Sequence, residues 1–382
     1  MYSVKSFGDM IADRVRVSAY TEALRRSIVP GSVVVEVGSG TGFFTLMACR
    51  LGAGRVYAIE ANPAISIAQA AAADNGYADR ISFIRQLSTQ VELPERADVL
   101  LSDLRGVLPL HTQHIPSIVD ARRRFLKPGG VQIPGCDRLW AGLIGNGKAY
   151  QARLRPWDQG LDGWNWAAAR SVTLNGWWRQ QFDAEDLLSD GELLFTLDYR
   201  TIENPQVFSS VTLRPRTAGT AYGVAVWFTA ELLDGVGFST APGETDTVYG
   251  PVFFPFESPL SLVETDVVTV DVFGNLTSAE YIWSWKTKVN GKFQFSQSEF
   301  KGGLSLEGSI RNSAGGFRPT VGAEGQIVRW ILEKMDGELT NQQLASGLRE
   351  RFPAQFSSEQ AALDRVVDAV RAFGGDPAPG EK

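Results

Sequence analysis

The chain has 382 residues, of which 44% are hydrophobic and 21% charged, and this is enough apolar sequence for two or three domains. Its formal net charge of −6 excludes the strongly basic face that nucleic-acid binders present, so we expect no nucleic-acid partner. No run of 18 apolar residues occurs, so the sequence predicts no membrane span. The two cysteines, Cys49 and Cys136, provide neither a disulfide framework nor a metal quartet, and they favour a cytoplasmic setting and no metal site.

Helices and strands alternate over the first third of the chain. Apolar residues at helical spacing predict a first helix over 7–28, which Pro30 and Gly31 end, and a short apolar run predicts a strand over 33–37. Further helices are expected at 43–51, 63–75 and 115–125, and further strands at 55–60, 81–85 and 98–102. This alternation is typical of a doubly wound, Rossmann-like α/β domain with a parallel sheet.

The pattern changes to antiparallel β after Pro134. Apolar and polar residues alternate between turn clusters at 192–199, 209–213, 223–228, 248–256, 267–273 and 281–287. We expect these strands to form a barrel or a sandwich. Tyr281, Trp283 and Trp285 share one face of the last strand, and we interpret them as core residues rather than as a ligand cage.

The last part of the sequence predicts a small helical unit. Its helices are expected at 324–335, 341–352 and 359–373, separated by Gly337 and Pro353. The predicted domains are therefore 1–135 (Rossmann-like), 136–315 (β-barrel) and 316–374 (helical), with a disordered tail at 375–382.

A glycine-rich turn follows the first expected strand. Residues 36–42 read Glu-Val-Gly-Ser-Gly-Thr-Gly, and glycines there let a ligand approach the backbone where a side chain would collide. A dinucleotide fold would require a third glycine in G-x-G-x-x-G, where this chain has Phe43. Glu60 ends the second strand, where its carboxylate can accept hydrogen bonds from both hydroxyls of a ribose. A generic turn with a helix-capping acid is the less favoured alternative, because all these elements occur in register.

From about Phe7 to Lys301 the chain resembles the protein arginine methyltransferase family. The resemblance rests on DRVRVSAY (13–20), EVGSGTG (36–42), YAIEAN (57–62), VELP (91–94), ADVLLSD (97–103), RRRFLKPGGVQIP (122–134), GTAYGVAVWF (219–228) and GFSTAP (237–242). It implies a class I methyltransferase that uses S-adenosyl-L-methionine and acts on a protein or peptide. Arg16 matches the residue that binds the cofactor's carboxylate, and Glu60 the one that binds its ribose. The predicted cofactor-binding residues are Arg16, Glu36, Gly38, Ser39, Gly40, Gly42, Glu60, Ala61, Leu87 and Ser88.

The substrate hairpin departs from that family. The family grips a guanidinium group with two glutamates, whereas here Asp103 matches the first, the second falls near Thr112 and is missing, and Arg105 adds a cation. The family's T-H-W motif reads Thr-Val-Tyr at 247–249, without its histidine. Because Asp103 and Arg105 share one side of an extended segment, we expect them to neutralise each other and arginine specificity to be weak. The alternative is that Arg105 turns away at the loop and Asp103 alone grips the substrate.

Three residues, Asp103, Arg105 and His114, are the candidates for catalysis. Asp103 would position the acceptor, and one of His111 and His114 would orient or deprotonate it. The histidine spacing also fits a metal site, but no acid or cysteine set completes one. A structural role in an exposed loop or at a helix start is a further alternative. Because Arg105 would suit an anionic substrate, a small-molecule methyltransferase stays open, as does a catalytically degenerate cofactor-binding scaffold.

Two further segments bear on partners. Residues 157–178 contain five tryptophans, and the resemblance implies pairing through an arm in this region, so we expect a homodimer. The alternative is that these rings fill the barrel core. The run Arg122–Arg124 spreads around its helix, so we interpret it as a solvated face paired with residues such as Asp120, rather than as a nucleic-acid patch.

Overall fold

The computed structural model describes residues 3–159, 163–277, 280–302, 316 and 318–374. The chain divides into two compact units, residues 1–304 and 305–382. The predicted boundary at 315 and the predicted disordered tail at 375–382 lie outside the described residues.

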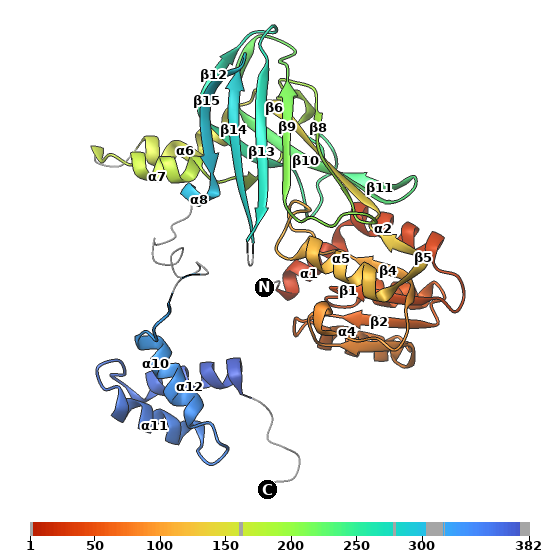
Figure 1. Ribbon diagram of the computed structural model, residues 1–382, viewed down its shortest axis with the longest axis vertical. Helices are drawn as coiled ribbons and strands as arrows, with labels where there is room; N and C mark the ends of the chain where they lie inside the picture. The colour runs from red at the N-terminus through yellow and green to blue at the C-terminus, as the bar shows by residue number, and fades with distance from the viewer. Residues whose placement is uncertain (1–2, 160–162, 278–279, 303–315, 317, 375–382) are drawn as a thin grey trace. The chain divides into compact units, whose positions relative to one another are not determined.

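A five-stranded parallel sheet forms the first part of unit one, in the order β3-β2-β1-β4-β5 (Figure 1). Its strands are β1 (Val33–Val37), β2 (Arg55–Ile59), β3 (Ile81–Ile84), β4 (Ala97–Ser102) and β5 (Leu126–Ile133). Because side chains alternate along a strand, Val34 and Val99 join one apolar cluster, whereas Val35 and Leu100 join another. The predicted doubly wound α/β domain is confirmed.

Helices cover both faces of this sheet. They are α1 (Val4–Ala12), α2 (Arg14–Ser27), α3 (Phe43–Arg50), α4 (Ile65–Asp74) and α5 (His114–Phe125). The prediction of a single helix over 7–28 is wrong, because the helix is interrupted at Asp13. There the backbone is extended, and the carboxylate accepts a hydrogen bond from Arg16 N at 3.0 Å, which caps the start of α2.

Two antiparallel sheets form the second part of unit one. The first has the order β7-β12-β10-β6-β8, with β11 paired to β10, and the second has the order β15-β14-β13-β9. Their strands are β6 (Cys136–Ile144), β7 (Trp178–Arg179), β8 (Glu192–Asp198), β9 (Val207–Leu213), β10 (Gly219–Leu233), β11 (Val236–Ser239), β12 (Val252–Leu262), β13 (Val268–Leu276), β14 (Tyr281–Val289) and β15 (Lys292–Ser298). Tyr281, Trp283 and Trp285 are buried in the core, as predicted.

Three helices of this part were not predicted: α6 (Lys148–Asp158), α7 (Ala167–Leu174) and α8 (Glu299–Gly302). The strand expected over 248–256 begins only at Val252, because Tyr249 turns into the site described below. Figure 1 shows β11 beside α2, where the antiparallel part packs against the parallel one.

Three helices make up the described part of the second unit: α10 (Ala323–Glu333), α11 (Asn341–Arg351) and α12 (Glu359–Phe373). Thr340 and Gln343 form a capping box at the start of α11. Ile331, Leu348 and Val366 are fully buried in a separate apolar cluster, so this unit has a core of its own. The predicted helical unit is confirmed. None of the helices in the described ranges has the length and apolar content needed to cross a bilayer.

Candidate active site

A cavity of about 450 Å³ opens at the carboxyl ends of the parallel strands. The segments after β1, β2 and β4 line it, together with residues of α1 and α2 and the loop that carries Val248 and Tyr249. In open α/β sheets, ligands bind outside the carboxyl ends of the strands, so this is the expected place for a cofactor.

The glycine turn after β1 forms one wall of the cavity. Gly38 and Gly40 have φ angles of +79° and +53°, which favour glycine. A Cβ on Gly38 would lie 2.5 Å from Leu104, and one on Gly40 would lie 2.6 Å from Phe7. The neighbouring Ser39 hydroxyl is buried, lines the cavity and has no partner among the described residues. A polar ligand would satisfy it, so this wall fits a bound cofactor.

Glu60 is held at the rim of the cavity by two backbone amides. One carboxylate oxygen accepts from Gly40 N at 2.8 Å, and the other accepts from Asn62 N at 2.7 Å. Because each carboxylate oxygen has two lone pairs, both can still accept hydrogen bonds from hydroxyl groups of a ligand.

Seven of the ten predicted cofactor residues line the cavity: Arg16, Glu36, Gly38, Ser39, Gly40, Glu60 and Leu87. The other three, Gly42, Ala61 and Ser88, do not line it. A Cβ on Gly42 would lie 2.7 Å from Ala68 of α4, so this glycine allows close helix packing. The Ser88 carbonyl accepts from Arg124 Nη2 at 2.6 Å, which holds the turn after β3.

Glu36 lies deep in the same wall. It is almost fully buried and accepts a hydrogen bond from the Thr45 hydroxyl. Burial raises the pKa of Glu36 to about 8, even though the Thr45 hydroxyl and the Arg16 charge favour the ionised form. Glu36 therefore presents a neutral carboxyl group to the cavity at pH 7.

Asp103 and Arg16, which both line the cavity, form an ion pair. Arg16 Nε donates to Asp103 Oδ2 at 2.6 Å, and the Tyr249 hydroxyl donates to the same oxygen at 2.5 Å. Arg105 Nη1 donates to Asp103 Oδ1 at 3.1 Å. Burial opposes the charge of Asp103, but Arg16 and Arg105 hold its pKa at about 2. Asp103 is thus ionised, and both its oxygens are engaged.

Arg105 is committed to the protein itself. Its Nε and Nη2 donate to the two carboxylate oxygens of Asp137 at 2.7 Å each, and Nη1 donates to the Tyr20 hydroxyl at 2.5 Å. Its side chain is 0% exposed. As predicted, Arg105 pairs with Asp103. The alternative that Arg105 receives an anionic substrate fits this geometry poorly, because its charge is already bound by Asp137.

His114 begins α5, as the alternative of a helix start expected, but it is buried rather than exposed. Its Nδ1 bonds the Pro109 carbonyl, which makes Nδ1 the donor and leaves the lone pair on Nε2. Nε2 has no partner among the described residues, and His114 lines the cavity. Burial lowers the pKa of His114 to about 4, so its ring is neutral at pH 7. His111 lies on the exposed loop before it, and in the described ranges no three potential ligands cluster to hold a metal.

Sequence reasoning missed Asp137 and Tyr199. The Tyr199 hydroxyl donates to Asp137 Oδ2 at 2.6 Å, so the two residues extend the network behind Arg105. The available signal was Asp137 itself, the only acidic residue in the otherwise mostly apolar segment that forms β6.

The comparisons with known proteins agree with this site. A family described as a methyltransferase domain matches residues 34–130, which carry the glycine turn, Glu60 and Asp103. This part of the chain is a class I methyltransferase domain. The predictions of that class and of S-adenosylmethionine as its cofactor are confirmed.

The sequence similarity to known proteins extends beyond the first domain. A probable protein arginine N-methyltransferase 6 of Arabidopsis thaliana is 30% identical over 249 residues, covering 63% of this chain and 57% of the relative. Protein arginine N-methyltransferase 6 of Xenopus tropicalis is 28% identical over 278 residues, covering 69% and 82%. The chain thus spans little more than half the length of the Arabidopsis relative. The resemblance to protein arginine methyltransferases is confirmed.

A solved structure shows the same fold. The Trypanosoma brucei PRMT1 enzyme–prozyme heterotetrameric complex with AdoHcy contains a chain that matches with a TM-score of 0.71 at 19% identity. The match covers 76% of this chain and 96% of the other, so it includes both the parallel and the antiparallel parts of unit one.

Proposed function

We propose that this methyltransferase methylates a side chain of a protein or peptide, and that ordinary arginine is a poor acceptor. The observation that carries the proposal is the single cavity that joins the glycine turn and Glu60 to Asp103 and His114. S-adenosylmethionine supplies a methyl group already activated on a sulfonium. The protein therefore has to hold the acceptor in line with that group and to exclude water.

Three residues are suited to hold the cofactor. Arg16 would bind its carboxylate, Glu60 would accept from its ribose hydroxyls, and the unpartnered Ser39 hydroxyl would take a further polar contact. Arg16 uses Nε and Nη1 for its bonds to Asp103, Tyr249 and the Met10 carbonyl, and Nη2 makes none with the described residues. Nη2 is thus the group best placed to bind the cofactor's carboxylate without breaking the pair with Asp103.

The charges around Asp103 favour a neutral acceptor. Two buried carboxylates, Asp103 and Asp137, face two buried guanidinium groups, Arg16 and Arg105, so the network carries no net negative charge. A guanidinium substrate would have to compete with Arg16, Arg105 and the Tyr249 hydroxyl for the Asp103 oxygens. A cation therefore gains less here than it would from two free carboxylates.

His114 can take the acceptor's proton or orient its lone pair. The acceptor's lone pair forms a bond to the methyl carbon while the carbon–sulfur bond breaks and its electrons stay on sulfur. The proton leaves to His114 Nε2 or to water. The low pKa of His114 keeps Nε2 unprotonated above about pH 5, so it can accept a hydrogen bond throughout the neutral range.

Labelled cofactor and whole-cell extract test this proposal. Label in the protein fraction supports it, whereas label confined to small molecules would favour a small-molecule methyltransferase. Cofactor binding with no transfer at all would favour a degenerate scaffold. Robust methylarginine formation on a Gly-Arg-rich peptide would show that a cation binds Asp103 well and would contradict the neutral acceptor.

We further propose a homodimer and a cytoplasmic location. Trp157 and Trp166 lie 6.2 Å apart, and Trp166 is 46% exposed, which suits a contact with a second copy. Trp177 and Trp178 instead pack on Phe254 and Phe253 in the β core. A monomer mass by light scattering at micromolar concentration would refute the dimer.

The two buried free thiols, at positions 49 and 136, suit a reducing compartment such as the cytoplasm.

A further inference from the structure

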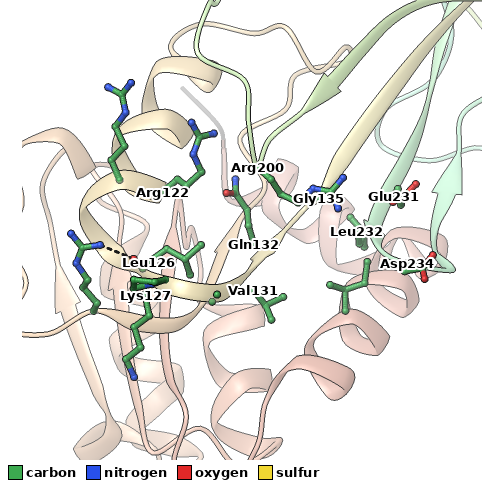
Figure 2. Close-up of a pocket in the computed structure, with 16 residues that line it drawn as sticks. Arg122, Leu126, Lys127, Val131, Gln132, Gly135, Arg200, Glu231, Leu232 and Asp234 are labelled. Carbon is green, nitrogen blue, oxygen red and sulfur yellow. Dashed lines mark hydrogen bonds between the residues drawn. The ribbon is translucent and has the colours of Figure 1, made fainter.

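A second cavity, of about 580 Å³, runs along the edge strand β5 (Figure 2). Residues of β5, the end of α5 and the turn between β10 and β11 line it. It shares no lining residue with the cofactor cavity. We call it the β5 groove. Neither the proposed methyl transfer nor the cofactor makes use of it.

Positive charge gathers in the β5 groove. It is lined by five cationic residues but only two acidic ones, Glu231 and Asp234; the cationic residues are Arg96, Arg122, Arg123, Lys127 and Arg200. Arg122 and Arg123 share one carboxylate, that of Glu203, and Arg96 donates to the Leu126 carbonyl with no carboxylate in ion-pair range among the described residues. Lys127 and Arg200 each have a carboxylate partner, but Arg96 has none and Arg122 and Arg123 share one, so guanidinium groups of the groove can still donate to an anion.

A buried amide in the same groove has no partner. Gln132 lies on β5 and is 5% exposed, and neither its Nε2 nor its Oε1 has a hydrogen bond with the described residues. Figure 2 shows its amide directed toward the side of the groove where Arg122 and Arg200 lie. Buried polar groups are nearly always paired, so both atoms point to a missing partner. An anion would accept from Nε2, and a hydroxyl group would donate to Oε1.

We propose that the β5 groove binds a small organic anion that also carries a hydroxyl group, such as a hydroxycarboxylate or the phosphate ester of a polyol. Guanidinium groups bind carboxylates and phosphates in a bidentate manner, so Arg96 and Arg123 suit either head group. Arg200 donates from Nε and Nη2 to Asp198, so only its Nη1 remains for a bound anion. The volume of the groove is that of a small-molecule site. Pro128, Gly129 and Gly130 interrupt β5 with a register shift, which makes this edge a poor template for an added peptide strand.

Calorimetry on the full chain tests the proposal with three probes: citrate, tricarballylate (citrate without its hydroxyl) and glycerol 3-phosphate. We expect saturable binding of citrate or glycerol 3-phosphate, and the tighter of the two identifies the head group. We expect citrate to bind more tightly than tricarballylate, because only citrate can donate to Gln132 Oε1. S-adenosylhomocysteine should bind equally well with and without citrate, since the two cavities are separate.

Two variants locate the binding. Arg123→Gln with Arg200→Gln should weaken binding of the preferred anion about tenfold or more, as expected for the loss of charge-assisted hydrogen bonds. Arg25→Gln, an exposed arginine on α2, is the matched control and should leave binding unchanged. Gln132→Leu should remove the preference for citrate over tricarballylate without lowering the thermal midpoint, because it deletes two unpartnered polar atoms.

Three results would overturn the proposal. The first is no saturable binding of any of the three anions at millimolar concentration. The second is equal binding by the double arginine variant and the wild type, which would place the anion elsewhere. The third is an oligo-aspartate peptide that binds more tightly than every small anion and is displaced by them, which would make the groove a surface for an acidic peptide.

Discussion

Replacing Asp137 by asparagine tests how much the buried ion pair between Asp137 and Arg105 contributes to the stability of the fold. Asp137 is 0% exposed and accepts two bonds of 2.7 Å from Arg105, whose side chain is also 0% exposed. Removing one partner of a buried ion pair costs about 3–5 kcal/mol, because it leaves an uncompensated charge. Asp103 and Tyr20 still contact Arg105, so we expect the lower end, about 3 kcal/mol.

Urea unfolding, followed by tryptophan fluorescence, measures this loss. With a denaturant slope of about 3 kcal/mol per molar, the midpoint of Asp137→Asn should fall by about 1 M. Asp198→Asn is the matched control, because it breaks a pair with Arg200 whose side chains are 34% and 56% exposed. Exposed pairs contribute less than about 1 kcal/mol, so its midpoint should shift little.

A double variant separates the charge from the packing. Arg105→Met with Asp137→Leu removes both charges and keeps the volume filled, so it should recover most of the stability lost by Asp137→Asn. The reasoning is refuted if Asp137→Asn loses no more stability than Asp198→Asn. It also fails if the double variant is less stable than Asp137→Asn, because the pair would then contribute more than the avoidance of an unpaired charge.

Four further outcomes are expected. Glu60→Ala and Arg16→Ala should each weaken binding of S-adenosylmethionine by about tenfold to a hundredfold, measured by calorimetry, and unchanged affinity in both would contradict the assigned cofactor contacts. Asp103→Ala should abolish turnover on the true acceptor while cofactor affinity stays within a few-fold, and full activity would mean that the acceptor is held from the antiparallel side. His114→Phe should lower kcat by about a hundredfold or more if Nε2 takes the acceptor's proton, with a smaller change in KM, whereas an unchanged kcat would leave proton removal to water. Because the pKa of Glu36 is raised in the folded state, its neutral form stabilises the fold below about pH 4.5, and this contribution is lost as the pH rises toward about 8. Glu36→Gln should therefore flatten the decline of the unfolding free energy between pH 5 and 8. Parallel curves of unfolding free energy against pH for the variant and the wild type would contradict the shift.

Local patterns were enough to locate most elements. The strands β1 to β4 lie within one or two residues of their predicted bounds, because each is a short apolar run bounded by turn residues. The fifth parallel strand, β5, was not predicted, because Pro128, Gly129 and Gly130 interrupt its apolar pattern. The break at Asp13 was missed, since apolar spacing continues across it and only the capping bond shows that a new helix begins there. The helices α6 and α7 were also missed: α6 contains Pro156, which is unfavourable inside a helix, and α7 has only 8 residues.

The substrate side of the site illustrates the limit of sequence reasoning. The i and i+2 spacing of Asp103 and Arg105 predicted their pairing, which the structure shows at 3.1 Å. The spacing could not show that Arg105 also forms an ion pair with Asp137. Asp137 lies on β6 of the antiparallel part, and the burial that makes the pair strong exists only once the two parts of unit one are packed together.

The sequence alone determined the cofactor half of this protein. The positive φ angles at Gly38 and Gly40 favour glycine, and Glu60 lies at the end of a strand. Both features depend on the local sequence, so the sequence alone could predict them. Only the tertiary structure decided what Asp103 can do. Its partners Arg16 and Tyr249 lie 87 and 146 positions away, and charges at such separations meet only after the apolar cores have closed and excluded water.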